Sequence, residues 1–380
     1  MGDTLESRII LSEEKTKFEL FLERYQNTSP VRVIIFGAGD QGFLALKLLK
    51  ENGVEIYAFC DNDPNKQGTT IKELPVLAPN ELKHMEQEVF VIINDSFYKE
   101  KQEQIKQLNM SHIHTFRFDV FNPLFKGFTK KYVLDHLKMF EKSYQLLEDE
   151  ESRNVFCGVL NSVLTGDLSY YEEVMTSTQQ YFQKNLIPKL ENHIFVDIGA
   201  YNGDTIEQFL EFTDGKYERI YAFEPIHSSA ELIKENLKGL PNFELYEVAA
   251  SNKKDKCAYY CNDYGELTMA TTIQSQGAND DIQYFYTDTI DKVINGKRVT
   301  FMKMDIEGSE LEALQGASET IKTNHPYLAI CVYHKKEDLI DIISYCKKLV
   351  PEYKLYLRHH SITPCDTVLY CLYEEEEIVQ

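Results

Sequence analysis

The sequence lacks any hydrophobic run near the roughly 20 residues that a membrane-spanning helix requires. Its first residues also lack the basic and apolar regions of a signal peptide. None of the eight cysteines forms a C-x-x-C pair, and no histidine cluster joins Cys257 and Cys261 to complete a zinc site. These absences predict a cytoplasmic protein with reduced thiols, no membrane span and no bound metal.

Basic residues are outnumbered: 40 Lys and Arg stand against 61 Asp and Glu, for a net charge of -21. A field of that sign repels phosphate backbones and anionic lipid head groups. Nucleic acid and membrane surfaces are therefore not expected as general partners, although a local basic patch could still bind a phosphorylated small molecule. The chain has 380 residues, more than one ordinary hydrophobic core holds, so more than one domain is expected.

Two segments share one order of elements: an apolar strand, a glycine-rich turn, a helix, and a second strand that ends in an acidic residue. The first segment begins at Val31 and the second at Ile194. Each is typical of the opening βαβ unit of an open α/β sheet. We therefore predict two Rossmann-like domains joined by a helical segment. The predicted boundaries are an N-terminal helical segment 1–29, a small Rossmann-like domain 30–120, a helical linker 121–190 and a larger domain 191–380.

In the first segment, Gly37, Gly39 and Gly42 form G-x-G-x-x-G between a strand and a helix, with Asp61 following 61 − 42 = 19 residues later. This context is typical of a dinucleotide site, in which the acid binds a ribose hydroxyl. The segment is, however, shorter than a full dinucleotide fold. Two interpretations stay open: a site for a nucleotide or nucleotide sugar, or a scaffold that keeps the glycine turn for packing.

In the second segment, the strand at 194–198 runs into D-x-G-x-x-x-G and then into a helix. Glycines let the backbone turn tightly and approach a ligand closely. We expect Asp197 and Asp204 to place carboxylates at the mouth of this loop, where they would repel phosphate and attract a cationic ligand. Glu224 ends the next strand, 224 − 203 = 21 residues after the last glycine, and is placed to accept ribose hydroxyls. Residues 248–252 are predicted to close a third strand with small side chains beside an adenine.

The run at 302–310, MKMDIEGSE, resembles the fourth-strand motif of the FkbM family of methyltransferases. Further runs that resemble this family lie at 149–153, 180–182, 196–205, 223–225, 287–291, 332–339 and 358–361. The resemblance covers roughly residues 145–373. It implies a seven-stranded class I methyltransferase sheet and S-adenosylmethionine as the cofactor. The predicted cofactor-binding residues are Asp197, Gly199, Tyr201, Asn202, Gly203, Asp204, Thr205, Glu224, Pro225, Ala249, Ala250 and Ser251.

The predicted catalytic residues are His334, Asp305 and Glu307, which follow two strands of the larger domain. The carboxyl ends of parallel strands share one edge of a sheet, so the three side chains can converge. His334 is the candidate base because an imidazole titrates near working pH; otherwise it is a surface residue. Asp305 contacts the cofactor or substrate, or caps the next helix. Glu307 is a substrate ligand or a first-turn acid.

The first interpretation is an O-methyltransferase acting on a hydroxyl of a sugar, glycan precursor or other small molecule in polysaccharide biosynthesis. The alternatives are a non-catalytic nucleotide-binding or nucleotide-sugar-binding module and an NAD-dependent sugar-modifying oxidoreductase using the N-terminal site. Asp197, Glu224 and the run at 302–310 together favour the first. A metal site built from Asp288, Asp305 and His334 is conceivable, although their spacing does not demand one. The acceptor is open, and a homo-oligomer is compatible with the sequence.

Overall fold

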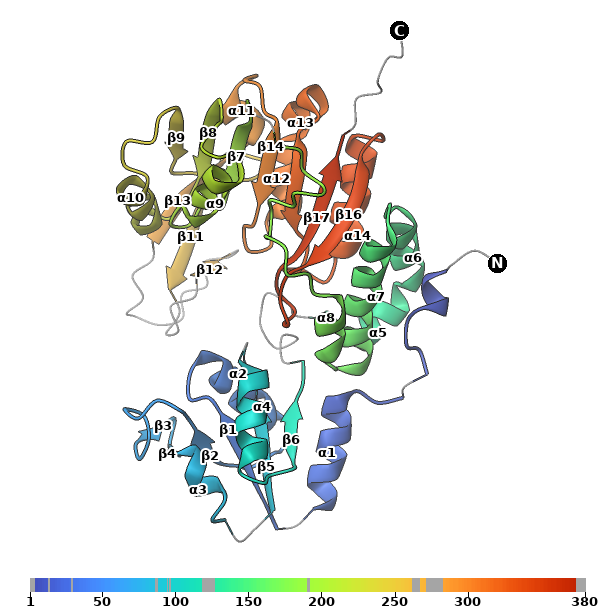
Figure 1. Ribbon diagram of the computed structural model, residues 1–380, viewed down its shortest axis with the longest axis vertical. Coiled ribbons are helices and arrows are strands. Elements are labelled where there is room, and N and C mark those ends of the chain that lie inside the picture. Colours follow the sequence, from blue (N-terminus) through green and yellow to red (C-terminus); the bar gives the residue numbers. More distant parts are fainter. Residues whose placement is uncertain are drawn as a thin grey trace. The chain divides into compact units, whose positions relative to one another are not determined.

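The computed structural model (Figure 1) describes residues 4–12, 14–28, 30–85, 88–93, 95, 97–117, 127–189, 192–261, 267–270 and 283–373. The chain divides into two compact units. The first comprises Met1–Glu141, Asn154–Met175 and Ser361–Pro364, and the second comprises Lys142–Arg153, Thr176–His360 and Cys365–Gln380. Helices α6 (Leu137–Gln145) and α7 (Glu150–Thr165) contribute residues to both units. Across the described ranges, no helix combines the length and the apolar character needed to cross a bilayer.

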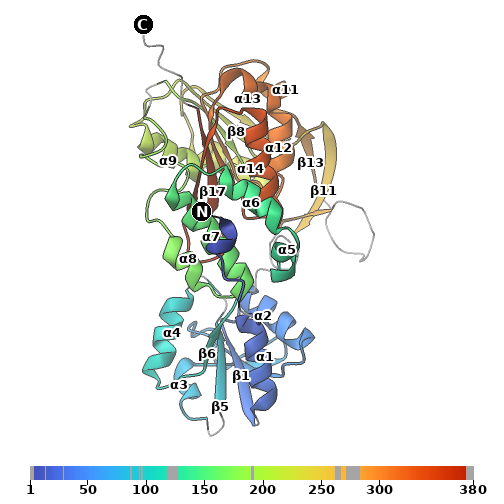
Figure 2. The same ribbon diagram turned by 90° about the vertical axis from the view of Figure 1, so that its right-hand side faces the viewer.

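The first unit is built around a mostly parallel sheet. Its elements are η1 (Leu5–Ser7), α1 (Lys17–Asn27), β1 (Val31–Phe36), α2 (Asp40–Glu51), β2 (Ile56–Cys60), β3 (Thr70–Ile71), β4 (Leu74–Leu77), α3 (Pro79–Leu82), β5 (Glu88–Ile93), α4 (Tyr98–Gln107), β6 (Ile113–Thr115), α5 (Lys130–Asp135) and α8 (Ser169–Val174). Within the described residues the strand order is β3-β4-β2-β1-β5-β6, with β3 antiparallel to β4 and the other pairs parallel. Figure 2 shows α1 and α2 on one side of this sheet and α4 on the other.

Aromatic residues join α1 to the sheet of the first unit. The ring of Phe21, on α1, is 2% exposed, and its centroid lies 5.1 Å from that of Phe116. His114, on β6, packs within this cluster, with ring centroids 5.0 Å from Phe21 and 5.1 Å from Phe90. Burial among aromatic rings removes water from the imidazole, and this destabilises the charged ring more than the neutral one.

His114 should make the first unit sensitive to acid. Burial, with the charges of Arg24 and His112, lowers the pKa of His114 to about 4, and Glu88, which faces those two side chains, does not reverse this. The unfolded chain, with a pKa near 6.5, binds the proton more tightly, so stability present at neutral pH is lost as the pH falls toward 4. Protonation of His114 alone should lower the free energy of unfolding of the first unit by about 2 kcal/mol between pH 7 and pH 5.

Calorimetric unfolding at both pH values checks this expectation. His114→Gln should remove that part of the pH dependence, whereas replacing the exposed His84 by glutamine should leave it unchanged. Equal acid sensitivity in the parent and the His114 variant would contradict the assignment.

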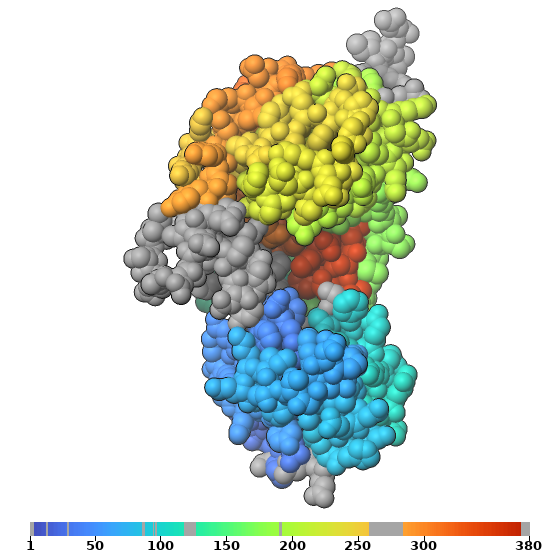
Figure 3. Space-filling model, turned by 90° about the vertical axis from the view of Figure 1, so that its left-hand side faces the viewer, coloured from blue at the N-terminus to red at the C-terminus, as the bar shows by residue number. Residues whose placement is uncertain are grey.

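The second unit contains a larger sheet and a smaller one. Its elements are β7 (Ile194–Ile198), α9 (Asp204–Phe212), β8 (Arg219–Phe223), α10 (His227–Asn236), β9 (Phe243–Tyr246), β10 (Ala249–Ala250), β11 (Asp255–Cys261), β12 (Leu267–Ala270), β13 (Gln283–Asp288), α11 (Ile290–Ile294), β14 (Phe301–Met304), α12 (Glu310–Gly316), α13 (Ser318–Asn324), β15 (Tyr327–Cys331), α14 (Asp338–Leu349), β16 (Lys354–His359) and β17 (Thr367–Leu372). In Figure 3, the lime to yellow surface belongs to the part of this unit that carries α9, α10 and β9.

The larger sheet has the order β16-β17-β15-β14-β7-β8-β9 among the described residues. Strands β15, β14, β7, β8 and β9 are parallel, and β17 runs antiparallel to both of its neighbours. Helices α12, α13 and α14 lie on one side of the sheet and α9 on the other (Figure 2). Layers on both faces explain why the central strands β7 and β14 are buried along their whole length. The seven-stranded α/β sheet predicted from the sequence is confirmed.

The smaller sheet, β10-β13-β11-β12, is not predicted by the sequence analysis. It changes the place of Ala249 and Ala250, which were expected to close the third strand of the larger sheet. That strand, β9, ends at Tyr246, and the two alanines instead pair in parallel with Thr287 and Asp288 of β13.

Candidate functional site

The chain reverses its direction of travel across the larger sheet between β7 and β14. From β7 it proceeds outward to β8 and β9 and then returns to β14 on the other side of β7. Ile198 pairs with Met304, and the backbone N–H of Asp305 donates to the carbonyl oxygen of Ile198 at 3.1 Å. Open α/β sheets bind ligands at the carboxyl ends of their strands at such a point. The glycine loop and the run at 302–310 therefore meet where a ligand is expected.

The first glycine of the loop is required by the neighbouring strand. Gly199 has φ +85°, and a Cβ added there would lie 2.0 Å from the carbonyl oxygen of Asp305. Gly203, with φ +91°, precedes α9, and its added Cβ would lie 3.1 Å from Cδ1 of Leu237. Between them, Tyr201 also has a positive φ, +48°, and 64% of the residue is exposed. The loop thus passes close to the end of β14 and presents a tyrosine ring to solvent.

The polar residues at the start of α9 bond mostly to their own backbone. Oδ1 of Asn202 accepts from the N–H of Asp204 at 3.1 Å, and Oδ1 of Asp204 accepts from the N–H of Thr205 at 2.9 Å. These bonds satisfy N–H groups that the first turn of a helix leaves unpaired. Asp204 is exposed and Thr205 is buried, so of the two only Asp204 has its side chain at the surface of the loop.

Glu224 follows β8, and its carboxylate turns back onto the glycine loop. Oε2 accepts from the N–H of Tyr201 at 2.9 Å, and Oε1 accepts from the N–H of Ile226 at 2.9 Å. Burial raises the pKa of Glu224, and these two backbone donors oppose the rise. Each carboxylate oxygen keeps a second lone pair. Glu224 therefore ties the loop to β8 and retains acceptors for a ligand hydroxyl; Pro225 comes directly after it.

Asp197 does not lie at the mouth of the loop as expected. Its side chain is 0% exposed, and Oδ1 lies 3.2 Å from Nζ of Lys303, whose side chain is 3% exposed. Lys303 also donates to the carbonyl oxygen of Gly199 at 2.7 Å. Burial raises the pKa of Asp197 to about 6, although the Lys303 ammonium acts to lower it. The carboxylate is thus part of a buried ion pair beneath the loop, because Asp197 and Lys303 are paired in the register of β7 and β14 and their side chains lie on the same face of the sheet.

Lys303 is a site residue that the sequence analysis missed. A lysine inside the apolar run of β14 was the available signal, because charged side chains are seldom buried without a partner.

The predicted catalytic side chains come together beside the end of β14. Nε2 of His334, which follows β15, lies 3.5 Å from Oδ1 of Asp305 and 3.6 Å from Oε2 of Glu307. The His334 side chain is 1% exposed, whereas that of Glu307 is 72% exposed. Glu307 has φ +55°. The imidazole therefore forms the buried side of the cluster, and Glu307 forms the side that is open to solvent.

Tyr181 and Glu310, which the sequence analysis did not single out, contact this cluster, and the Tyr333 hydroxyl donates to Oδ1 of Asp305 at 3.5 Å. The Tyr181 hydroxyl donates to Oδ2 of Asp305 at 2.7 Å. Oε1 of Glu310 lies 3.0 Å from Nδ1 of His334, within ion-pair distance although outside hydrogen-bond geometry, and it also accepts from the N–H of Ile306 at 2.9 Å. Both residues stand in runs that resemble the FkbM family, which was the signal available for them.

The carboxylates around His334 control its charge. Burial alone would lower the pKa of His334, but the Glu310 carboxylate, with those of Asp305 and Glu307, raises it to about 9. The pKa of Asp305 is lowered, because Lys303 and His334 outweigh its burial. At neutral pH the ring is therefore mostly protonated, and a protonated ring donates hydrogen bonds but accepts no proton.

The predicted adenine contacts lie on and after β10. Ala250 is 5% exposed, and Ala249 and Ser251 are partly buried. The N–H of Ser251 donates to the carbonyl oxygen of Asp288 at 3.0 Å, which holds this short segment against β13. The assignment of these three residues to the cofactor stays a prediction.

The glycine loop of the first unit is held by its own acid. Oδ2 of Asp61 accepts from the N–H of Ala38 at 2.8 Å and lies 3.3 Å from Nζ of Lys66. A Cβ added to Gly42 would lie 1.9 Å from the carbonyl oxygen of Gly37, so packing alone requires that glycine. A Cβ added to Gly39 would have no neighbouring atom within 4 Å, so packing does not require a glycine there. Whether this loop binds a nucleotide stays a prediction.

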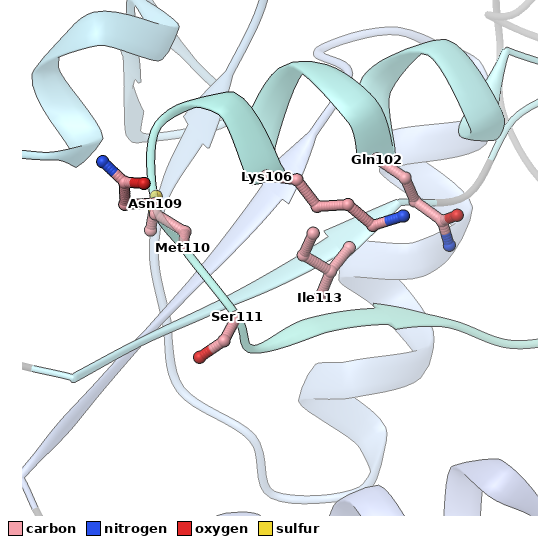
Figure 4. Close-up of a pocket in the computed structure, with 6 residues that line it drawn as sticks. All are labelled: Gln102, Lys106, Asn109, Met110, Ser111 and Ile113. Atoms are coloured by element: carbon pink, nitrogen blue, oxygen red, sulfur yellow. The ribbon is translucent and has the colours of Figure 1, made fainter.

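The first unit also carries a surface pocket, between α4 and β6 (Figure 4). It is lined by Gln102, Lys106, Asn109, Met110, Ser111 and Ile113. None of these is a predicted site residue. The pocket is therefore separate from the glycine loop that the sequence analysis proposed as a second site.

Two parts of the chain match the models of known protein families. Residues 197–355 match the methyltransferase FkbM domain, and residues 29–116 match a domain described as C2185-like, N-terminal. No curated protein matches the sequence. The resemblance to the FkbM family is thus confirmed over residues 197–355, which match the methyltransferase domain of that family.

Solved structures support the fold. Methyltransferase FkbM from Methylobacillus flagellatus KT has a TM-score of 0.73 and 23% identity, over 96% of this chain and 94% of that chain. An rRNA methylase from Streptococcus thermophilus has a TM-score of 0.32 and 15% identity, over 49% of this chain and 89% of that chain. Fibrillarin from Aeropyrum pernix, with natively bound S-adenosyl-L-methionine, has a TM-score of 0.32 and 10% identity, over 49% and 69%. Only the first resembles this chain closely enough to support the fold.

Proposed function

We propose that the second unit uses S-adenosylmethionine to methylate a hydroxyl of a sugar, a glycan precursor or another small molecule. The observation that supports this most is the pairing of the glycine loop with Glu224 at the point where the sheet reverses. Both lie in or beside the domain that matches the FkbM methyltransferases. An acid at the end of the second strand is suited to the two ribose hydroxyls of an adenosyl group.

The reaction requires few covalent steps from the protein. Bound S-adenosylmethionine would supply an electrophilic methyl group, and the acceptor oxygen would take it as the carbon–sulfur bond breaks and the neutral thioether leaves. The proton of the acceptor hydroxyl would pass to a base of the site or to water. The enzyme's main contribution is to hold the two reactants in an attacking geometry. The glycine loop lies close to the end of β14 at Gly199. This close contact limits the positions open to the cofactor and so helps to hold it in an attacking geometry.

The acceptor is proposed to bind beside Asp305, Glu307 and His334. These side chains offer both carboxylate acceptors and an imidazole at the edge of the sheet where the cofactor would end. The base role predicted for His334 can be tested by the dependence of the reaction rate on pH. Since the pKa of His334 is about 9, a reaction that needs the neutral ring would accelerate with pH until about pH 9.

Glu224→Gln should weaken S-adenosylmethionine binding by about tenfold to a hundredfold, because it replaces a carboxylate that accepts two hydroxyls with a neutral amide. Calorimetric titration of the full-length protein measures the affinity. Glu211→Gln, an exposed substitution at the end of α9, is the matched control and should bind like the parent. Parental affinity in the Glu224 variant would remove that residue from the site, and absence of binding by the parent would overturn the proposed function.

The acceptor can be identified by a screen for transfer of a tritiated methyl group to nucleotide sugars and glycan precursors. Binding of NAD instead of S-adenosylmethionine would favour the oxidoreductase interpretation, and binding of a nucleotide without transfer would favour a binding module. The predicted domain boundaries, the cytoplasmic location and a nucleotide site at Gly37, Gly39, Gly42 and Asp61 remain predictions within this proposal.

A further inference from the structure

We propose that Asp305, Glu307 and His334 form a binding site for one divalent transition-metal cation, of the kind that accepts mixed nitrogen and oxygen ligands. The cation site itself stands apart from the proposed function. A role for the cation in methyl transfer, in which the acceptor oxygen would coordinate to it, rests on the proposed function.

The three side chains have the arrangement that a metal ion needs. One ligand atom from each, Nε2 of His334 and a carboxylate oxygen of Asp305 and of Glu307, lies within 4.8 Å of the others. Within the described part of the chain, neither ring nitrogen of His334 makes a hydrogen bond, and the side chain is 1% exposed. Nε2 is directed at two carboxylate oxygens 3.5 Å and 3.6 Å away without a hydrogen bond to either, and a bound ligand could satisfy such a buried ring nitrogen.

The residues behind the cluster orient its ligands. Glu310, with 0% of its side chain exposed, lies 3.0 Å from Nδ1 of His334 and so leaves Nε2 facing Asp305 and Glu307. The Tyr181 hydroxyl donates to Oδ2 of Asp305 at 2.7 Å, while Oδ1 faces the imidazole and accepts only a long hydrogen bond, of 3.5 Å, from the Tyr333 hydroxyl. Metal-binding histidines commonly have a carboxylate at their second ring nitrogen, and metal-binding carboxylates are themselves hydrogen-bonded.

The charge around the cluster attracts a cation. The carboxylates of Asp305, Glu307 and Glu310 surround one imidazole. Of the nearby lysines, Lys303 lowers the pKa of Asp305 but makes its ion pair with Asp197 at 3.2 Å, and Nζ of Lys335 lies 3.8 Å from Glu312. A bound dication would neutralise much of this excess negative charge.

The ligand types indicate the class of metal. One imidazole with two carboxylates suits Mn²⁺, Fe²⁺, Co²⁺ or Zn²⁺, whereas Mg²⁺ and Ca²⁺ favour oxygen ligands alone. Three protein ligands leave open positions for exogenous oxygen, as in catalytic rather than structural sites. Glu307, 72% exposed, lies on the open side. The Nε2 lone pair cannot both bind a cation and accept a proton, so this assignment would replace the base role predicted for His334.

A second cluster of the same composition gives a matched control. His227, Glu231 and Glu247 also place ligand atoms within 4.8 Å of one another, but all three residues are exposed. His227 and Glu247 pair at 3.0 Å, and Glu231 pairs with Lys234 at 2.7 Å. No buried imidazole or second carboxylate behind the ring is found there among the described residues, so we expect little affinity for metal.

The test is a Mn²⁺ titration of the full-length protein, stripped with a chelator, in which paramagnetic resonance reports free Mn²⁺. One ion should bind per chain. Glu307→Gln should weaken binding by at least about tenfold, and so should His334→Gln. Glu247→Gln should bind like the parent. The exposed Glu307 makes its variant the safer one for folding, and circular dichroism checks that both variants fold.

The outcomes separate this proposal from the proposed function. No binding by the parent, or binding lost in Glu247→Gln but kept in Glu307→Gln, overturns the metal site. S-Adenosylmethionine is titrated into the same samples: if it binds while Mn²⁺ does not, only the metal site fails. If Mn²⁺ binds and S-adenosylmethionine does not, the metal site stands and the proposed function fails.

Discussion

Gly199→Ala should abolish S-adenosylmethionine binding and destabilise the second unit by more than about 4 kcal/mol. The positive φ of +85° alone would cost a side-chain-bearing residue about 1–2 kcal/mol. The larger part comes from the added Cβ, which would lie 2.0 Å from the carbonyl oxygen of Asp305 and 2.9 Å from Cγ2 of Ile306. These atoms belong to the two residues that directly follow β14, so relief requires the loop or this segment to move.

Gly215→Ala separates the two contributions. Gly215 has a similar φ, +71°, but an added Cβ there meets nothing within 4 Å. This variant should lose only about 1–2 kcal/mol and should bind the cofactor like the parent. Thermal unfolding and calorimetric titration measure both effects. If the two glycine variants unfolded at the same temperature, close approach to β14 would not be the reason for the glycine.

Lys303→Met should destabilise the second unit by about 3–5 kcal/mol, because it leaves the carboxylate of Asp197 buried without a partner. It also removes the donor that holds the carbonyl oxygen of Gly199 at 2.7 Å, so cofactor affinity should fall with stability. Lys297→Met is the matched control. Lys297 pairs with Glu244 at 3.3 Å, but 43% of its side chain is exposed, and its loss should cost less than about 1 kcal/mol.

A double variant tests whether the buried pair itself stabilises the fold. Burial raises the pKa of Asp197 to about 6 in spite of Lys303, so desolvation outweighs the attraction between the two charges. Replacing both partners, with Asp197→Leu and Lys303→Met, should therefore recover most of the stability that Lys303→Met loses. Chemical denaturation of the three proteins measures this. Additive losses would show that the two side chains act independently, contrary to our interpretation.

Local patterns were sufficient to predict the strands of the larger sheet. The strand expected at 194–198 is observed as β7, and the strand expected to end in Glu224 is observed as β8, which ends one residue earlier, at Phe223. Buried parallel strands are short apolar runs between turns, and such runs are visible in a sequence. The smaller sheet escaped this reasoning, because β10 (Ala249–Ala250) is too short for a periodic signal and depends on pairing with β13.

Side-chain partners across the sheet were not predictable from local spacing. The hydroxyl of Tyr181 donates to Asp305 across 124 positions of sequence, and Lys303 donates to Gly199 across 104. The sequence analysis therefore assigned Asp197 to the mouth of the loop without knowing that a lysine would pair with it beneath the loop. A short-range motif gives the position of a residue on its strand, but only the neighbouring strand decides its partner.

The sequence by itself determined the class of the sheet, the glycine loop of the second unit and the acid Glu224 that follows it, because these depend on the order and period of nearby residues. Only the tertiary structure decided that Asp197 is buried, that Glu310 and Tyr181 orient His334 and Asp305, and that His334 is held in its charged form. Burial and pKa depend on atoms contributed by several strands, and those atoms meet only when the sheet has formed.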